Sequence, residues 1–425
     1  MPTAGAKSTQ ANFALPKFLY QEEVLMNQVK LGIIGLGNMG SGHCNNILAG
    51  LTPEIKLTAA ADLRPSRRDW AKETLPDDVV LFENGEQLIE SGLCDAVIIA
   101  TPHYEHPRLA ILAFEHGLHV MSEKPAGVYT KQVREMNEAA IRSGKVFGMM
   151  FNQRTNCVYR KMHEMVQSGK YGQIKRVNWI ITDWYRTQAY YNSGGWRATW
   201  DGEGGGVLLN QCPHNLDLLQ WICGLPCRVR AFCHNGKWHQ IEVEDDVTAY
   251  LEFPNGATGV FVTTTADAPG TNRFEITLER GKLVAEHDKL TFFELEQSER
   301  DFCFTATGGF EQPAGHEVTI ELDGKNPQHV GVLNAFAGAI LRGEPLVANG
   351  TEGIRGLELS NAMHLSSWTD QTVTLPIDEA LFLEKLNEHR KASKVKTEVT
   401  EATFDTSDSY GSKVSDNTDK GGVKA

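Results

Sequence analysis

The sequence lacks any apolar run long enough to cross a membrane. A spanning helix needs about 20 consecutive apolar residues, and no stretch of the 425 residues approaches that length. The N-terminal segment mixes Ala, Lys, Gln and Glu, with neither a basic stretch followed by an apolar core nor a twin-arginine pair. We therefore expect no membrane partner, no export signal and a cytoplasmic location.

The sequence also has fewer basic than acidic residues. Lys and Arg number 41 against 54 Asp and Glu, so the formal net charge is −13 at pH 7 with histidine neutral. A general nucleic-acid-binding surface must be basic because it contacts phosphates. The balance argues against a nucleic-acid partner, and it is compatible with a neutral or weakly charged small substrate.

The eight cysteines form neither a disulfide framework nor a clear metal motif. They are scattered, and several lie inside apolar stretches, which is typical of reduced thiols in the cytosol. One cluster contains Cys223, Cys227 and Cys233 followed by His234. A zinc site would need a second closely spaced pair, so we interpret these cysteines as buried thiols and expect no metal.

The first half of the chain has the pattern of an α/β domain. Short apolar runs alternate with amphipathic stretches from Val29 onward, which indicates β-α-β units and a parallel sheet. The predicted strands are 29–35, 55–61, 79–82, 96–100, 119–122 and 146–151. The predicted helices are 38–49, 66–74, 87–91, 105–116 and 131–143. Six strands fit a complete, doubly wound Rossmann domain over residues 29–152.

The second half changes rhythm and predicts an α/β domain with an antiparallel meander over residues 153–391. Short β-rich runs with a Pro254-Asn255-Gly256 turn are typical of hairpins. The predicted strands are 174–182, 229–234, 247–253, 259–265, 273–279, 282–286 and 290–294. The predicted helices are 158–168, 207–223, 330–341, 353–369 and 377–391. One sheet face would pack on helices, and the other could support a subunit contact.

Two tails flank these domains. Residues 1–28 form an N-terminal arm, and residues 392–425 are rich in Ser, Thr, Lys, Asp and Gly with few large apolar side chains. We expect the second tail to be disordered or loosely held. The last predicted helices could pack back on the Rossmann domain.

A glycine-rich turn predicts a dinucleotide site. Gly35-Leu36-Gly37-Asn38-Met39-Gly40 follows an apolar strand and opens a helix, which is the context that the fingerprint requires. The first glycine permits a tight turn, the second lets a pyrophosphate approach the backbone, and the third lets helix and strand pack closely. The helix N-terminus would then donate amides to the phosphates.

An acidic residue at the end of the next strand indicates which dinucleotide binds. Asp62 can accept both hydroxyls of the adenosine ribose and would repel a 2′-phosphate. NAD is therefore the predicted cofactor, with NADP the less favoured alternative because Arg64, Arg67 and Arg68 follow closely. The alternative interpretation of Asp62 is a helix cap or a solvated loop residue. We place Arg64 in the cofactor site as well.

Two further strand ends carry polar residues. Ala100-Thr101-Pro102-His103 ends the fourth strand and Glu123-Lys124-Pro125 ends the fifth, and ligands lie over the carboxyl ends of parallel strands. A third stretch, Gly204-Gly205-Gly206-Val207-Leu208-Leu209-Asn210-Gln211-Cys212-Pro213-His214-Asn215-Leu216-Asp217, follows in the second domain. Together with the glycine turn, these segments resemble the glucose–fructose oxidoreductase and inositol dehydrogenase (Gfo/Idh/MocA) family over residues 29–390. The predicted cofactor contacts at the strand ends are Thr101, Pro102, His103, His106, Glu123 and Lys124.

The resemblance implies a second domain with an open, mainly antiparallel sheet, which agrees with the strand pattern. It also implies oxidation or reduction at a secondary carbinol of a sugar, cyclitol or related polyol. Hydride transfer requires removal of the hydroxyl proton, and a histidine with an ordinary pKa near 6.5 suits that role. We assign His214 as the general base and Lys124 as the group that holds the reacting oxygen. The alternatives are a core histidine and a surface ion pair.

One departure from the family pattern concerns Asn210. Many members have an aspartate four residues before the histidine, and an amide cannot raise the histidine pKa as a carboxylate would. His214 could work with a lower pKa, or the proton could pass through Lys124; Asn210 could instead cap the helix. Asp217 lies three residues beyond His214 and shares its helix face.

Polar and aromatic residues between the domains are candidates for substrate contact. Aromatic planes and bidentate polar groups suit sugars, which present both C–H faces and hydroxyls. The alternative is packing of an aromatic loop onto the sheet or onto another subunit. The predicted substrate-binding residues are Asn152, Arg154, Trp184, Arg186, Arg197, Asn210 and Asp217.

Three functions follow from these patterns. The leading hypothesis is an NAD-dependent dehydrogenase of a sugar, glycoside or cyclitol, with C3 of a glucoside as one target. The second keeps NAD bound and uses it transiently for net glycoside cleavage or epimerisation. The third is a nucleotide-sensing protein without catalysis, since the fold alone does not exclude it. We also expect a homo-oligomer.

Overall fold

Six parallel strands form the first sheet, in the order β3-β2-β1-β4-β5-β6. This computed structural model describes residues 28–394, 396 and 399, so the predicted arm lies almost entirely outside the described residues, as does most of the predicted tail. The strands are β1 (Val29–Ile34), β2 (Ile55–Ala61), β3 (Val80–Phe82), β4 (Ala96–Ile99), β5 (His119–Ser122) and β6 (Phe147–Met149). The doubly wound fold is confirmed.

The strand order also explains where the site must lie. β1 pairs with β2 on one side and with β4 on the other, so the chain turns in opposite directions after β1 and β4 and leaves a crevice at the carboxyl ends. Helices connect the strands: α1 (Asn38–Leu48), α2 (Pro65–Thr74), α3 (Gly85–Glu90), α4 (Glu105–Glu115) and α5 (Thr130–Ser143). Every predicted strand and helix of this domain is present, and no end is displaced by more than two residues.

The second sheet has nine strands in the order β14-β13-β12-β11-β7-β10-β9-β8-β15. Only β7 and β10 pair in parallel among its described strands, so the prediction of a mainly antiparallel sheet is confirmed. The strands are β7 (Ile174–Ile181), β8 (Arg228–Asn235), β9 (Glu244–Glu252), β10 (Thr258–Thr264), β11 (Asn272–Leu278), β12 (Gly281–Glu286), β13 (Lys289–Leu295), β14 (Gly315–Thr319) and β15 (Val373–Thr374).

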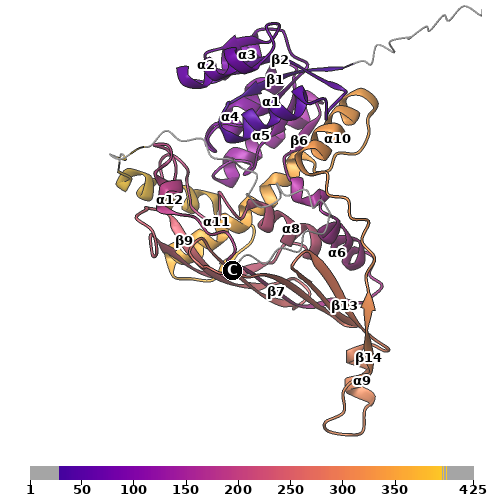
Figure 1. The fold of residues 1–425 in the computed structure, drawn as a ribbon. Coiled ribbons are helices and arrows are strands. Elements are labelled where there is room, and N and C mark those ends of the chain that lie inside the picture. The colour runs from indigo at the N-terminus through magenta and orange to yellow at the C-terminus, as the bar shows by residue number, and fades with distance from the viewer. Residues whose placement is uncertain (1–27, 395, 397–398, 400–425) are drawn as a thin grey trace, which may run out of the picture.

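Helices cover one face of this sheet. α6 (Cys157–Gln167), α8 (Pro213–Cys223) and α11 (Gly353–Thr369) lie between the sheet and the Rossmann domain, and in the described part of the chain no helix covers the opposite face (Figure 1). β13 and β14 continue with α9 (Glu299–Thr305) into a projecting hairpin at the lower edge of the molecule. The remaining helices are the short 3₁₀ turns η1 (Asn152–Thr155) and η2 (Gly350–Glu352), and α7 (Gln188–Asn192), α10 (Gln328–Arg342) and α12 (Glu379–Ala392).

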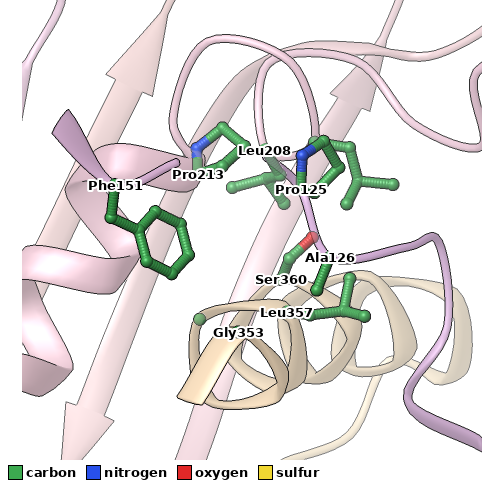
Figure 2. A pocket seen from close by; sticks show the side chains of 10 residues that line it. Pro125, Ala126, Phe151, Leu208, Pro213, Gly353, Leu357 and Ser360 are labelled. Atoms are coloured by element: carbon green, nitrogen blue, oxygen red, sulfur yellow. The ribbon is translucent and has the colours of Figure 1, made fainter. Parts of the chain in front are cut away.

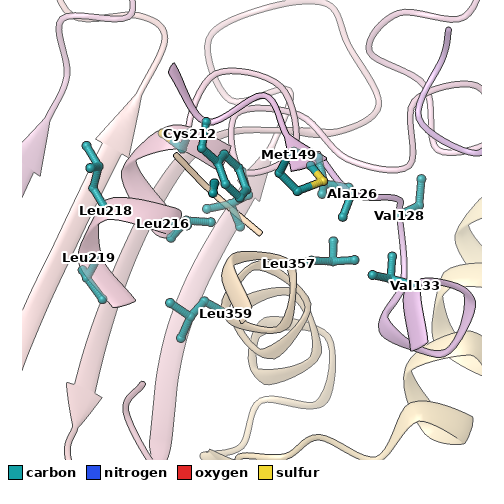
Figure 3. Packing of buried hydrophobic residues seen from close by; sticks show 14 of the residues in the cluster. Ala126, Val128, Val133, Met149, Cys212, Leu216, Leu218, Leu219, Leu357 and Leu359 are labelled. Atoms are coloured by element: carbon teal, nitrogen blue, oxygen red, sulfur yellow. The ribbon is translucent and has the colours of Figure 1, made fainter. Parts of the chain in front are cut away.

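One hydrophobic core joins the two domains. Ala126 and Val133 of the first domain, Leu216 of α8 and Leu357 of α11 belong to the same buried cluster, and Figure 3 shows α11 between the Rossmann side and α8. On the other face of the first sheet, Phe336 of α10 packs with strand residues in a second cluster. Because packed side chains resist separation, the domains hold the strand ends and α8 in one fixed arrangement.

The predicted helix over residues 207–223 is wrong in its first part. α8 begins only at Pro213, and residues 207–212 form turns. The buried Glu244 carboxylate accepts hydrogen bonds from the amides of Gly206 and Leu208, so a side chain from β9 fixes the backbone in place of helical bonds. Asn210 therefore does not cap the helix, and Cys212 precedes its first residue. The short elements α7, α9, β14 and β15 were not predicted.

Candidate active site

The glycine turn has the geometry that a pyrophosphate requires. Gly35 has a positive φ of 95°, and a Cβ there would lie 2.5 Å from the Ala100 carbonyl oxygen. A Cβ on Gly40 would lie 1.8 Å from the Gly35 oxygen, so these two positions need glycine for folding. A Cβ on Gly37 would meet nothing closer than an Arg64 nitrogen at 3.8 Å. Space is therefore left beside Gly37, where α1 begins without a side-chain cap.

Asp62 connects the end of β2 to this turn. Its Oδ2 accepts from the Leu36 amide at 2.8 Å and its Oδ1 accepts from the Arg64 amide at 2.9 Å. Arg67 and Arg68 donate to the backbone carbonyls of Leu36, Asp62 and Leu63. Arg64 has a side chain that is about half exposed, and its Nε donates to Asp62 Oδ1 at 3.3 Å. These residues fit NAD, and they leave one arginine near the position of a 2′-phosphate.

The loops after β4 and β5 are tied together by a buried histidine. The His106 ring lies between the Pro125 oxygen, 2.8 Å from Nδ1, and the Thr101 oxygen, 2.7 Å from Nε2. Both ring nitrogens are used in this way, so an effect of His106 on the cofactor would act through the loops. His103 turns toward the second domain, where its Nδ1 lies 3.2 Å from the Glu203 carbonyl oxygen.

Glu123 is a buried carboxylate with a partner that the sequence analysis missed. Its Oε1 lies 2.8 Å from Nε2 of His43 on α1, and both side chains are almost fully buried. Burial opposes ionisation of Glu123, but the hydrogen bond from His43 and the charges of His43, His329 and Lys124 outweigh it and lower the pKa to about 2. His43 had no sequence signal, because it lies 80 residues before its partner.

Lys124 reaches from the first domain to the second. Its Nζ donates to the Asn210 carbonyl oxygen at 2.9 Å. Burial lowers the pKa of this ammonium, while Glu123 and Glu203 oppose the shift. A lysine with a lowered pKa that remains cationic can donate to a reacting oxygen.

His214 lies on the first turn of α8 and is 7% exposed. Burial lowers its pKa well below 6.5, and the charges of Lys124 and His329 push in the same direction. Its Nδ1 has no hydrogen-bond partner among the described residues. The imidazole is therefore neutral at pH 7 and available as a base.

A small cavity shows that the two loops meet. It has a volume of about 10 Å³, and Pro125 and Pro213, the chain neighbours of Lys124 and His214, line it from opposite sides (Figure 2). α11 closes it with Leu357 and Ser360. It holds at most one water, so it is a packing gap behind the site. A larger hollow of about 330 Å³ lies near Asp95, at the opposite end of the strands.

The side chain of Asn210 belongs to a network that the sequence did not reveal. Its Oδ1 accepts from the Tyr190 hydroxyl at 3.2 Å, and its amide donates to the Glu203 carboxylate. Arg197 donates to the same hydroxyl at 2.7 Å. Arg186 lies over the rings of Tyr190 and Trp184 at 5.2 and 5.5 Å. The structure therefore brings Trp184, Arg186, Arg197 and Asn210 together beside Lys124.

The remaining predicted substrate residues lie elsewhere. Arg154 and Asp217 form a buried bidentate ion pair with N–O distances of 2.7 and 2.8 Å, and Arg154 also pairs with Glu352. The amide of Asn152 donates to Gln328 at 2.5 Å, while its Oδ1 has no partner in the described chain. Arg154 and Asp217 thus have partners within the protein, and their contact with substrate remains a prediction.

Residues 184–200, here called the aromatic loop, are held by hydrogen bonds at both ends. His239 lies between the Asp245 carboxylate and the Arg186 carbonyl oxygen, at 3.0 and 2.9 Å. The Tyr104 hydroxyl, from the Rossmann domain, donates to the Trp200 carbonyl oxygen at 2.8 Å. The described part of the predicted tail also contacts this loop, since Lys396 donates to the Tyr191 carbonyl oxygen. These hydrogen bonds hold the aromatic loop in a fixed position beside Lys124.

Two family models match the chain. The model described as the oxidoreductase family with an NAD-binding Rossmann fold matches residues 29–151. The GFO/IDH/MocA C-terminal domain matches residues 159–284. The chain belongs to the Gfo/Idh/MocA oxidoreductase family. The resemblance is confirmed, and NAD is the cofactor of the first domain.

Relatives in this family match both domains. Myo-inositol 2-dehydrogenase of Thermotoga maritima is 23% identical over 353 residues, which are 82% of this chain and 98% of that protein. D-glucoside 3-dehydrogenase of Escherichia coli is 27% identical over 255 residues, or 54% of this chain and 68% of that protein. The structure of the WlbA dehydrogenase from Chromobacterium violaceum with NADH and UDP-GlcNAcA matches with a TM-score of 0.69 and 25% identity, over 84% of this chain and 98% of the other.

Two properties of the described structure concern membranes and metals. None of the described helices combines the length and the apolar character needed to cross a bilayer. Among the same residues, no three or more His, Cys, Asp or Glu side chains are arranged to hold a metal ion. Cys223, Cys227 and Cys233 are free thiols.

Proposed function

We propose that this Gfo/Idh/MocA oxidoreductase transfers a hydride between a secondary hydroxyl of a sugar, glycoside or cyclitol and NAD. The observation that carries the proposal is that Lys124, which follows β5, donates to the carbonyl oxygen of Asn210, four residues before His214, and that the charge of Lys124 acts on His214. Lys124 is a partly buried cation held by Asn210, and His214 is a buried, neutral imidazole. Relatives named as inositol and glucoside dehydrogenases support the substrate class.

In oxidation, the substrate hydroxyl loses its proton to the His214 imidazole while its carbon loses a hydride. Bound NAD supplies the acceptor for that hydride. Lys124 holds the reacting oxygen and stabilises the negative charge that develops on it. His214 is suited to accept the proton because burial keeps it neutral. In reduction, the same two groups return the proton and hold the carbonyl oxygen.

The substrate would lie against the aromatic loop beside Lys124. Arg186 and Arg197, which lie over the rings of Trp184 and Tyr190, offer donors for sugar hydroxyls. C3 of a glucoside is the specific target that we favour, because a D-glucoside 3-dehydrogenase is among the relatives, and it matches 54% of this chain.

The test is incubation with NAD and a panel of glucosides, free sugars and inositols, followed by absorbance of NADH and mass analysis of the products. The wild-type protein should oxidise at least one class, and Lys124→Ala should not. If no substrate yields NADH or an oxidised product, dehydrogenase activity is refuted. NAD that remains bound without net NADH, together with a cleaved or epimerised product, would instead identify transient use of the cofactor.

We also propose that the protein is a homo-oligomer. The uncovered face of the nine-stranded sheet carries Ile180, Phe232, Tyr250 and Phe293, each between 40% and 52% exposed. Apolar side chains gathered on one sheet face favour association. Light scattering measures the mass directly, and a mass of about 47 kDa, that of one chain, would contradict this proposal.

A further inference from the structure

A second acidic group lies beside Lys124, outside the motifs that define the proposed reaction. Glu203 directly precedes Gly204-Gly205-Gly206 and is 1% exposed. Its Oε2 accepts from the Ala198 amide at 2.5 Å, and its Oε1 accepts from the side-chain amide of Asn210 and lies 3.9 Å from Arg197. The carboxylate is thus held on three sides, by a backbone amide, a carboxamide and a guanidinium.

Glu203 is connected to Lys124 through a single residue. Asn210 uses its side chain for Glu203 and its carbonyl oxygen for the Lys124 ammonium. The backbone of Glu203 contributes as well, because its carbonyl oxygen lies 3.2 Å from Nδ1 of His103, at the end of β4. One residue therefore contacts both the loop after β4 and the residue that holds Lys124.

The charge balance around this carboxylate is mixed. Burial raises the pKa of Glu203, whereas Arg197, the Ala198 amide and Asn210 oppose the shift. The charged and titratable groups around Glu203 or Lys124 come from several elements. They are Glu123 after β5, His103 and His106 after β4, Cys212 before α8, His214 of α8, His329 of α10, Arg186, Tyr190, Tyr191 and Arg197 of the aromatic loop, Glu244 of β9, and Lys396.

The surroundings of Lys124 explain why a carboxylate is needed there. Arg186 and Arg197 are cations that disfavour a third positive charge, and burial disfavours it further. Asn210 is uncharged and cannot compensate. Glu123 is engaged by His43. Glu203 is the other negative group that favours the ammonium form of Lys124.

We propose that Glu203 is a positioning residue for the hydride transfer: acting through Asn210, it holds the Lys124 ammonium at the reacting oxygen and supplies the negative charge that Asn210 lacks. This inference rests on the proposed function. Glu203 touches neither the reacting atoms nor the cofactor in this scheme, so its effect is on the charge and the place of Lys124.

The kinetic test compares Glu203→Gln with the charge-relocating variant Glu203→Gln/Asn210→Asp. Glu203→Gln should lower kcat by roughly 10- to 100-fold with a smaller change in KM, and the alkaline limb of its pH profile should move to lower pH. The double variant restores a carboxylate one residue away and should recover most of both losses. Glu358→Gln is the matched control, because Glu358 is a half-buried carboxylate of α11 that accepts a backbone amide far from this network.

The protonation of Lys124 can also be measured directly, without any enzymatic turnover. In protein labelled with ¹³C-lysine, the Cε signal of Lys124, assigned through Lys124→Arg, reports its protonation by NMR. Glu203→Gln should move the Lys124 titration to lower pH, and Asn210→Asp alone should move it to higher pH. If Glu203→Gln does not fold, the comparison of wild type with Asn210→Asp and with Glu203→Asp carries the test.

The outcomes separate the two proposals. An active wild-type enzyme whose Lys124 titration and pH profile are the same in Glu203→Gln overturns the role of Glu203 and leaves the proposed function standing. A wild-type protein that oxidises no polyol, but whose Lys124 titration shifts in Glu203→Gln, refutes the proposed function and supports the charge coupling. Loss of activity without recovery in the double variant indicates a purely structural role and contradicts the inference.

Discussion

The cofactor half and the substrate half of the site are built in different ways. The glycine turn and Asp62 lie within one β-α-β unit, and the amides that Asp62 binds are at most 26 positions away. The network around Lys124 joins residues 86 positions apart, across two domains. The cofactor half binds one cofactor. Its turn needs glycine at positions 35 and 40 because a Cβ there would collide with backbone oxygens. The second half depends on how two sheets and α11 pack.

The largest expected effect is at the junction of the two halves. Lys124→Ala should lower kcat by about 100- to 10,000-fold, because it removes the donor to the reacting oxygen. NAD affinity, measured by calorimetry, should change much less, since the glycine turn is untouched. Lys145→Ala is a control of equal size on the far edge of the first domain. A parallel loss of NAD binding would show that the two halves are not separable.

Two glycines of the same turn should behave differently. Gly40→Ala places a Cβ 1.8 Å from the Gly35 oxygen, so this variant should misfold or lose NAD binding entirely. Gly37→Ala meets no atom within 3.8 Å, so it should fold normally and weaken NAD binding by about tenfold through contact with the pyrophosphate. Thermal melting and calorimetry distinguish these cases. Equal stability of both variants would contradict the steric argument.

A smaller effect is expected at Asp62. Asp62→Asn removes the charge that repels a 2′-phosphate and leaves Arg64 free to attract it. NAD affinity should fall by about tenfold and NADP affinity should rise. Arg64→Ala in the same background should remove the gain for NADP but not the loss for NAD. Calorimetry with both nucleotides measures the ratio, and an unchanged ratio would contradict the assignment of this carboxylate.

The smallest expected effects are those of pH, which compare His214 with Lys124. His214 must be neutral to accept a proton, so activity should be lost only as pH falls through its depressed pKa, which lies below 6.5. Lys124 must be cationic, so activity should be lost as pH rises through its lowered pKa, below 10.5. The profile of kcat/KM should be bell-shaped, and the Lys124→Arg variant should extend the alkaline limb. An acid limb above pH 6.5 would contradict the burial of His214.

The fold could be predicted where a repeating pattern determined it. Parallel strands such as β4 are buried on both faces and have unbroken apolar runs, and α5 has one clear apolar face. The helix predicted from residue 207 failed because its first turns depend on Glu244, a residue in another strand. Short elements such as β15 have no pattern of their own, because they exist only by pairing with β8.

By itself, the sequence determined the class of the protein and the identity of its cofactor, since the glycine turn and Asp62 act through local geometry. It also pointed to Lys124 and His214 through two short motifs. Only the tertiary structure decided which groups surround them. His43 reaches Glu123, and Glu203 reaches Lys124 through Asn210, because the core shared by both domains holds distant segments together. Charges act through space, so their partners depend on the packing and not on their order along the chain.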